Sequence, residues 1–406
     1  MVKKEEKYAI IGGTLIDGTG KDPLKNAVVI VEGRKIAEVG SKNDVAIPSD
    51  CERVDASGLT IMPGLIDCHV HLTGCRGKDP IYWMGLVEPP ILRAVRAVFD
   101  AWKILDHGFT TVGDMGSPNA IYLKRAIEEG TAIGPRIIAC GRALGRTGGH
   151  GDLRRDIYAF PEQFVRESLA LSEICDGVDG VRRAVRKLAG MGADCIKFFA
   201  SGGGSWQNDR MEDLHFTLEE MKAIVDEAHM YGMKVHAHAE GIKSVRAAVE
   251  VGVDTIEHGD ILDEHVCEEM VRKNIILVPT ISVYYVGPWA AWEDQQKSFN
   301  IARKAGVKIA LGSDAFVEDW TPYGEYNIGE IKKLVDWGLS PMEAIMSATK
   351  IASEALGVEN LTGTLEKGKS ADILLVEGNP LEDITVLLNK KNIKKIIKEG
   401  KNVKRL

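Results

Sequence analysis

The sequence predicts an α/β fold, a (β/α)8 barrel with a small β-sandwich built from both chain ends. From residue 59 onward, apolar strand-like runs alternate with helical patterns, and eight such units over roughly 250 residues match a (β/α)8 barrel. The regions before and after are β-rich and lack a helical pattern. The predicted division is 1–58 for the N-terminal part of the sandwich, 59–360 for the barrel and 361–406 for the C-terminal part.

The two β-rich ends contain short runs of strand-forming residues. The first set lies at 8–11, 28–31 and 35–39, separated by Gly, Asp and Asn turns. The second set lies at 363–365, 371–376 and 393–397. Since these sets flank one βα region, we expect the two ends to meet in a single sandwich.

The central region contains eight strand-like runs with helical patterns between them. The predicted strands lie at 63–68, 109–113, 136–140, 194–199, 233–237, 253–257, 275–278 and 307–311. The predicted helices lie at 91–107, 120–129, 180–191, 218–231, 242–251, 263–273 and 298–305, with trailing helices at 324–337 and 341–356. Thr217 and Glu220 form a capping-box pattern, and Gly232 marks the end of that helix.

Composition narrows the class of protein. The 406 residues carry a formal net charge of −8, which argues against a nucleic acid or an anionic membrane surface as partner. There is no apolar run of about 18 residues, so we expect no transmembrane helix. The seven cysteines include no Cys-x-x-Cys pair and indicate reduced thiols, hence a cytoplasmic protein.

The strongest local pattern is the run from Pro63 to His71. Apolar residues lead to Asp-Cys-His69-Val-His71, and side chains two apart on a strand share a face. Two imidazoles at the mouth of a barrel can hold one divalent metal ion. Alternatively, one histidine is packed in the core and the other is exposed.

Other predicted strands also end in polar residues, and barrel active sites lie at the C-terminal ends of the strands. These residues are His238, His258 and Asp314, and Lys197 lies inside an apolar strand. Each has an ordinary explanation, such as a core histidine, a lysine that reaches solvent, or an aspartate that caps a helix. Such explanations at all these strands of one barrel are improbable together.

Lys197 suggests a chemical hypothesis. Burial and nearby cations would both lower its pKa, and a neutral amine reacts with CO₂ to give a carbamate that can bridge two metals. In this hypothesis His69, His71 and Asp314 hold one divalent ion, and His238 and His258 hold the other. A bridging hydroxide then forms near neutral pH, and Asp314 acts as its general base and later as the acid for the leaving amine.

These residues resemble the amidohydrolase superfamily over nearly the whole chain. The matching motifs are Gly18-Thr-Gly, Pro63 to His71, Lys197 in Ile-Lys-Phe-Phe-Ala-Ser-Gly-Gly, His258 in Ile-Glu-His-Gly, Asp314 in Gly-Ser-Asp, and Gly368-Lys-Ser-Ala-Asp-Ile. The resemblance implies a (β/α)8 barrel, a split β-sandwich and hydrolysis of carbon–nitrogen bonds. Thr147-Gly-Gly-His150-Gly-Asp and Ala200-Ser-Gly-Gly are similar to the binuclear-zinc, carboxylated-lysine subgroup of prolidase-like and Xaa-Arg/Lys dipeptidases.

The subgroup also implies residues that contact substrate. By this resemblance His150 polarises the scissile carbonyl or binds a carboxylate, and Tyr284 lines the pocket. Without the resemblance, His150 would be a loop histidine that binds a nearby carboxylate of the protein. The strand-5 ligand of the subgroup ends a Val-x-x-His strand, which favours His238 over His236. Relatives carry tyrosine or histidine two residues after this ligand, where this chain has Glu240. A carboxylate there would favour a cationic group of the substrate, and a solvated glutamate at a helix start is an equal alternative.

Further aromatic residues lie in the predicted mouth loops, where they would line an apolar pocket or serve packing. They are Tyr82, Trp83, Trp206, Tyr285, Trp289 and Trp292.

The sequence therefore predicts a binuclear zinc hydrolase that cleaves the amide bond of a dipeptide or an N-acyl amino acid. A one-metal heterocycle deaminase is the main alternative, disfavoured by Lys197 and by the His238-Ala-Glu240 spacing. A urea, carbamate, lactone or phosphotriester remains open as substrate. We also expect a homo-oligomer that acts on a small molecule and binds neither nucleic acid nor membrane.

Overall fold

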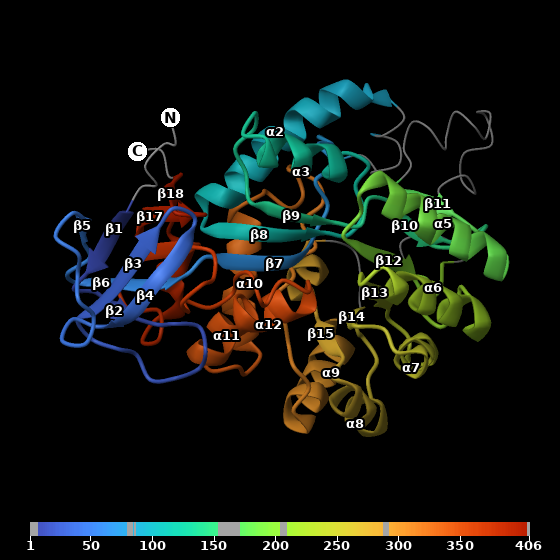
Figure 1. The fold of residues 1–406 in the computed structure, drawn as a ribbon. Helices are drawn as coiled ribbons and strands as arrows, with labels where there is room; N and C mark the ends of the chain where they lie inside the picture. Colours follow the sequence, from blue (N-terminus) through green and yellow to red (C-terminus); the bar gives the residue numbers. More distant parts are fainter. Residues whose placement is uncertain are drawn as a thin grey trace.

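The structure is a computed structural model that describes residues 7–403 apart from 79–83, 85–86, 153–170, 204–208 and 287–291. The described strands form four sheets. Two sheets, in the lobe at the left of Figure 1, come from the two chain ends. The other two are parallel and lie among helices. The protein is thus a mixed α/β structure.

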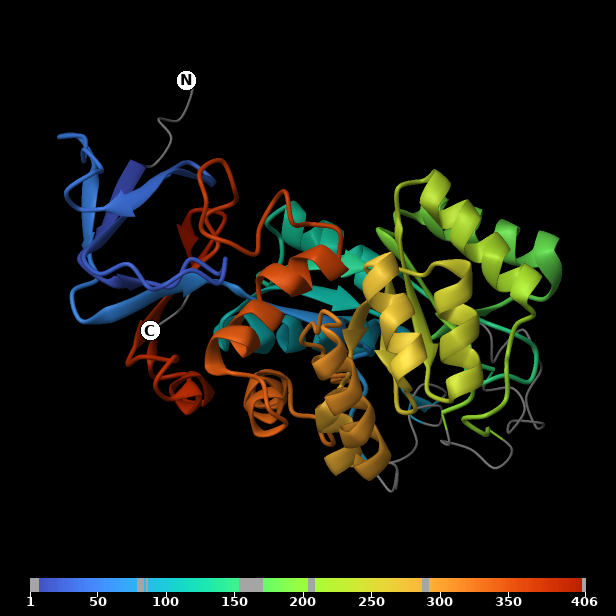
Figure 2. The ribbon, with the colours of Figure 1, turned by 90° about the horizontal axis from the view of Figure 1, so that it is seen from below.

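Strands from both chain ends make up the end lobe (Figures 1 and 2). One sheet has the order β4-β3-β1-β5, with β1 Lys7–Ile11, β3 Ala27–Glu32, β4 Lys35–Ser41 and β5 Glu52–Asp55. The second has the order β18-β17-β16-β6-β2, with β2 Thr14–Leu15, β6 Leu59–Pro63, β16 Ile373–Glu377, β17 Ile393–Lys398 and β18 Lys401–Asn402. Ile10 and Val29 share one hydrophobic cluster with Leu375 and Ile397. The ends therefore bury each other's apolar faces.

The join between the lobes lies at Gly64. Strand β6, which the sequence division places in the central region, pairs antiparallel with β16 in the end lobe. A Cβ at Gly64 would lie 2.1 Å from Thr110 Oγ1, so only glycine fits where the chain passes from β6 to β7. The expected strand at 363–365 does not form, and there Leu365 N donates a hydrogen bond to Asp17 O.

The parallel strands form a three-stranded sheet, β7-β8-β9, and a six-stranded sheet, β11-β10-β12-β13-β14-β15. Their bounds are β7 Leu65–Val70, β8 Phe109–Asp114, β9 Arg136–Ala139, β10 Ala143–Gly145, β11 Ser172–Ile174, β12 Cys195–Phe199, β13 Lys234–Ala239, β14 Thr255–His258 and β15 Ile276–Val278. Strands β10 and β11 were not predicted.

The segment predicted as the eighth strand, 307–311, forms no named strand. It makes an isolated parallel bridge from Leu277 to Ile309, and Leu311 O accepts a hydrogen bond from Cys68 N. The segment therefore lies between β15 and β7. On the other side, Asp194 N donates to Ala139 O and links β9 to the start of β12.

Helices follow most of the parallel strands (Figure 1). They are α2 Pro90–Asp106, α3 Ala120–Glu128, α5 Gly177–Met191, α6 Leu218–Met230, α7 Ile242–Val251, α8 Glu264–Lys273, α9 Trp292–Ala305, α10 Glu325–Asp336, α11 Pro341–Ser347 and α12 Lys350–Ala355, with 3-10 helices η2 Ile281–Tyr285 and η3 Ile384–Leu388. The predicted capping box at Thr217 and Glu220 is confirmed. None of the described helices combines the length and apolar character needed to cross a bilayer.

The single helix predicted over 341–356 is two helices. The carbonyl of Ser347 accepts a hydrogen bond from Leu311 N, and that of Ala348 accepts one from Ile66 N. These contacts draw the backbone toward the central strands, and the prediction of one helix is wrong for that reason.

Candidate metal centre

Polar side chains from several parallel strands meet in one buried cluster. The six predicted ligands are His69, His71, Lys197, His238, His258 and Asp314. The ring centroids of His69 and His258 lie 5.3 Å apart, and those of His238 and His258 lie 4.7 Å apart. Asp314 Oδ1 lies 3.2 Å from His71 Nε2 and 3.5 Å from His69 Nε2. The structure thus brings the predicted ligands together.

Three of these residues offer atoms close enough to hold one metal ion. His69, His258 and Asp314 each present one ligand atom, and these atoms lie within 4.8 Å of one another. The group combines His69 and Asp314, predicted for one ion, with His258, predicted for the other. Two imidazoles and a carboxylate suit a divalent transition metal.

Two of these residues have a left-handed backbone conformation. His258 has φ 71° and Asp314 has φ 54°, in the left-handed region that costs non-glycine residues on the order of 1–3 kcal/mol. Asp314 N donates a 2.8 Å hydrogen bond to His69 O. Tertiary contacts therefore hold these residues in orientations that local preference alone would not give.

Three of the imidazoles in the cluster are oriented through Nδ1. His69 Nδ1 lies 2.7 Å from Glu257 Oε2, and His258 Nδ1 lies 2.7 Å from Thr280 Oγ1. His71 Nδ1 lies 3.1 Å from the carbonyl of Gly116. Metal-binding histidines are fixed in the same way, with the other nitrogen available to the metal.

The electrostatics also suit a cation. Burial lowers the pKa of His69 to about 4 and holds that of His258 well below its ordinary value. Burial opposes ionisation of Asp314, but the neighbouring His69 ring and the hydrogen bond from His71 hold its pKa below the usual range, and that hydrogen bond raises the pKa of His71 in turn. A neutral imidazole, which burial favours at His69 and His258, and an ionised carboxylate are the protonation states that bind metal.

Lys197 is fully enclosed at the base of the cluster. Its side chain is 2% exposed, and burial lowers its pKa against the opposing charges of Glu257 and Asp314. A buried lysine of this kind has a raised fraction of neutral, reactive amine.

The two strand-5 histidines have different surroundings. His238 lies beside His258 and stacks on His150 with ring centroids 4.6 Å apart. His236 is deeper, with Nδ1 3.1 Å from Glu257 Oε1 and Nε2 buried without a partner. This placement agrees with the choice of His238 as ligand and of His236 as support beneath it.

The predicted substrate residues surround His238. His150 Nδ1 lies 2.6 Å from Asp209 Oδ2. Glu240 is buried, with Oε1 3.5 Å from His238 Nε2, so it is not a solvated glutamate. Tyr284 donates a 2.6 Å hydrogen bond to Asp260. Burial and the charge of Asp260 raise the pKa of Glu240 well above its ordinary value.

The predicted mouth aromatics are mostly not described. Tyr82, Trp83, Trp206 and Trp289, and the side chain of Trp292, lie outside the described residues. Tyr285 is 54% exposed, and Lys333 Nζ lies 4.1 Å from its ring centroid.

Comparison with known proteins identifies the family. The sequence pattern of the amidohydrolase family matches residues 60–403. The chain belongs to the amidohydrolase family. Ochratoxinase from Aspergillus niger is 36% identical, over 98% of this chain and 87% of its own length. Its crystal structure gives a TM-score of 0.90, covering 100% of this chain and 97% of that one at 34% identity.

Two further crystal structures are similar to this amidohydrolase. A prolidase complexed with N-methylphosphonate-L-proline gives a TM-score of 0.90 at 33% identity, covering 98% of this chain and 100% of that one. A Xaa-Pro dipeptidase with bound methionine gives a TM-score of 0.85 at 32% identity, covering 98% of this chain and 99% of that one. The predicted prolidase-like resemblance is confirmed. The family and these neighbours imply a barrel with a β-sandwich, hydrolase chemistry and, generally, divalent metals.

The residues that orient the histidines of this amidohydrolase were not predicted from its sequence. Glu257 contacts both His69 and His236, and it is fully buried. Its position two residues after Thr255 and next to His258 places it on the same strand face as Thr255, which is the signal that could have found it. Thr280 and Asp209 lie in loops after strands, so no strand alternation in the sequence could have indicated them.

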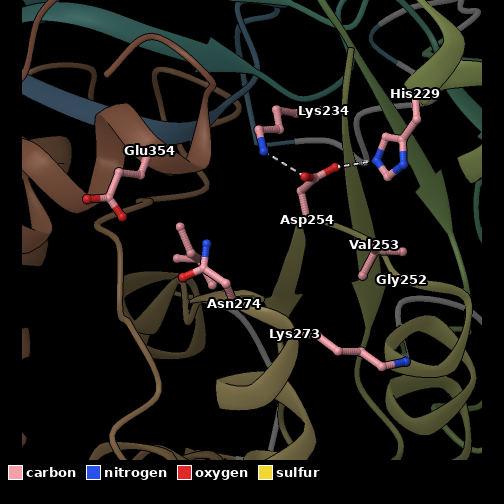
Figure 3. Close-up of a pocket in the computed structure, with 9 residues that line it drawn as sticks. His229, Lys234, Gly252, Val253, Asp254, Lys273, Asn274 and Glu354 are labelled. Atoms are coloured by element: carbon pink, nitrogen blue, oxygen red, sulfur yellow. Dashed lines mark hydrogen bonds and ion pairs between the residues drawn. The ribbon is translucent and has the colours of Figure 1, made fainter. Parts of the chain in front are cut away.

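A cavity of the amidohydrolase, of about 440 Å³, lies at the ends of the strands opposite the histidine cluster (Figure 3). Asp254 accepts a 2.7 Å hydrogen bond from Lys234 Nζ and lies 2.9 Å from His229 Nε2. Lys273 Nζ donates to the carbonyls of Val249 and Glu250. These charged groups are satisfied by one another or by backbone carbonyls, which indicates a role in stability.

Proposed function

We propose that this amidohydrolase is a metal-dependent hydrolase that cleaves the amide bond of a dipeptide or an N-acylated amino acid. The observation that carries the proposal is the group of His69, His258 and Asp314, whose ligand atoms lie within 4.8 Å of one another. The names of its relatives, ochratoxinase, prolidase and Xaa-Pro dipeptidase, support an amide-like substrate.

Two zinc ions are the proposed cofactors. The proposed ligands are His69, His71 and Asp314 for one ion, His238 and His258 for the other, and Lys197 as a carbamate between them. When bound, the ions would supply an activated water and polarise the scissile carbonyl. The enclosed Lys197 amine supports the carbamate, because the reaction with CO₂ needs a neutral amine and yields an anion that replaces a buried cation.

Asp314 is the proposed general acid and base. Its carboxylate lies at the centre of the cluster, so it can accept a proton from the attacking water and return it to the leaving amine. The depressed pKa keeps it ionised before the reaction, as a base requires.

His150 is the proposed contact to the scissile carbonyl or to a substrate carboxylate. Asp209 fixes its ring, and the ring stacks on His238, so its free nitrogen is held beside the proposed metal site. Tyr284 and Glu240 are the proposed walls of the substrate pocket. A carboxylate at Glu240 would favour a substrate amine, either an amino terminus or a basic side chain.

A one-metal deaminase is the second candidate, because His69, His258 and Asp314 alone form a complete one-ion group. Lys197 is unexplained in that design. Hydrolysis of a urea, carbamate, lactone or phosphotriester would use the same groups.

The decisive experiment is metal analysis of protein purified with zinc and bicarbonate, followed by assay against dipeptides, N-acyl amino acids and heterocyclic amines. We expect two zinc ions per chain and release of amino acid from the first two groups. One ion per chain with ammonia release from the heterocycles would establish the deaminase instead.

The arrangement of the chain supports three lesser proposals. We propose that the two parallel sheets and the segment 309–315 close into one (β/α)8 barrel. The division 1–58, 59–360 and 361–406 stays a prediction, and pairing of β6 with β16 favours a first boundary at Gly64. The seven cysteines are free and buried, which supports the proposed cytoplasmic location.

A further inference from the structure

The outer face of α2 is wholly apolar. Every residue of this helix that is exposed lacks charge, namely Pro90, Ile91, Leu92, Val95, Val98 and Phe99. Val87, just before the helix, adds to the same surface. Figure 1 shows α2 along the upper edge of the molecule. We call this surface the α2 face, and a solvent-facing helix surface is normally polar.

The helix cannot turn this face inward, because its other side is already fixed. Ala97, Ala101 and Ile104 are buried in the central core. The buried Asp100 forms a bidentate ion pair with Arg76. The α2 face is therefore a permanent feature of the fold.

The spacing along the α2 face is that of a helix-pairing seam. Ile91, Val95, Val98 and Trp102 follow steps of four, three and four residues. This alternation is the heptad spacing that places side chains against a partner helix. Phe99 broadens the seam, with its ring stacked on Trp102 at 5.3 Å between centroids.

Charge defines the kind of partner. Arg96 pairs with Glu88 and Lys103 pairs with Glu318, so the two partly exposed basic residues of α2 are neutralised at the border, and the third, Arg93, is buried. A membrane-binding helix instead presents free Lys and Arg to anionic lipids. Two copies of a chain of net charge −8 repel each other, and an apolar surface whose bordering charges are paired is where they can meet at the least electrostatic cost.

We propose that the α2 face binds the α2 face of a second copy of this chain, as an antiparallel helix pair about a two-fold axis. An apolar seam is complementary to itself, as a two-fold interface requires. The exposed apolar side chains amount to on the order of 500 Å², near the upper range for monomers. Two copies bury about twice that area, which reaches the ~1,000 Å² of a specific interface. This inference does not depend on the proposed function.

The test is the mass of the full-length protein by light scattering across a dilution series. We expect a multiple of the chain mass for the wild type, and half that multiple for Val95→Glu at the same concentrations. The matched control is Met230→Glu, an equal change at a 75% exposed methionine on α6, which should assemble like the wild type. Circular dichroism establishes that each variant is folded. A monomeric wild type, or an assembly that Val95→Glu leaves intact, would overturn the proposal.

A second measurement covers the case in which Val95→Glu does not fold. All seven native cysteines are buried and free, so Val98→Cys adds an exposed thiol. Near the two-fold axis it should cross-link under mild oxidation to twice the chain mass, while the wild type should not. Failure of Val98→Cys to cross-link faster than Met230→Cys would refute the antiparallel pair. Flotation of the wild type with phosphatidylserine vesicles would also refute it, in favour of a membrane surface.

Discussion

Strand β13 runs from one kind of electrostatic environment to another. At its start, Lys234 is paired with Asp254, which also contacts His229 (Figure 3). At its end, His238 lies among other histidines and burial holds its pKa well below the ordinary value. One end has opposite charges that neutralise each other, and the other has neutral donors gathered around an ionised aspartate. The first arrangement stabilises the fold, and the second is suited to a bound cation.

The two ends of the parallel strands also differ in which residues have a positive φ. His258, Thr280 and Asp314 have positive φ values of 71°, 48° and 54° at the histidine end. At the other end the positive φ falls on Asn274, a residue that tolerates it. Of the six described non-glycine residues with positive φ, three lie at the histidine end, and the others are Asn26, Asn274 and Glu399.

The largest expected effect comes from Lys197→Ala. We expect loss of bound metal and a fall in kcat/KM of about a thousandfold or more, since the lost charge stabilisation is worth several kcal/mol. Added formate or acetate should partly restore both metal content and activity. Full activity of Lys197→Ala without an added carboxylate would show that no carbamate at this position is needed to bridge the two proposed metal ions.

The next effect is expected for His150→Ala. We predict a fall in kcat of roughly 10²–10³-fold, the usual result of removing one donor to the reacting carbonyl. Metal content measured by mass spectrometry should stay unchanged, because His150 lies beside the cluster. Loss of metal would instead show that His150 is itself a ligand.

Glu257→Gln tests whether His69 depends on its carboxylate partner. Glutamine has one acceptor oxygen where glutamate has two, so it cannot accept hydrogen bonds from both His69 and His236. We therefore expect metal affinity to fall roughly 10–100-fold. The measurement is zinc binding by competition with a chelator. Unaltered affinity would mean that His69 is positioned without Glu257.

The matched change at the other end is Asp254→Asn. Burial raises the pKa of Asp254, but hydrogen bonds from Lys234, His229 and Val235 N bring it below 3.8. Its stabilisation is therefore complete above pH 3.8 and is lost as pH falls through the lower folded pKa. We expect Asp254→Asn to lower the free energy of unfolding by about 1–2 kcal/mol near pH 7, and by little in strong acid.

Metal affinity and kcat of Asp254→Asn should equal those of the wild type. Urea unfolding at several pH values, with zinc binding on the same samples, measures both. A change in zinc affinity would show that the two ends are coupled.

Much of this molecule follows from its sequence. Alternation of apolar strands and amphipathic helices identified most central elements, because buried positions recur in the sequence with the period of the strand or helix that contains them. Polar residues at strand ends identified the cluster, since parallel strands bring their carboxyl ends to one edge. Sequence patterns did not reveal that 341–356 divides into two helices, because carbonyls there bond to distant strands.

By itself, the sequence determined the family and which imidazoles, amine and carboxylate would be available, because side-chain chemistry and strand position are local properties. Only the tertiary structure decided that Glu257 orients His69 and His236 and that Asp209 orients His150. It also decided that the α2 face is exposed to solvent. Those contacts join residues far apart in the chain, and local periodicity holds no information about which distant segments pack together.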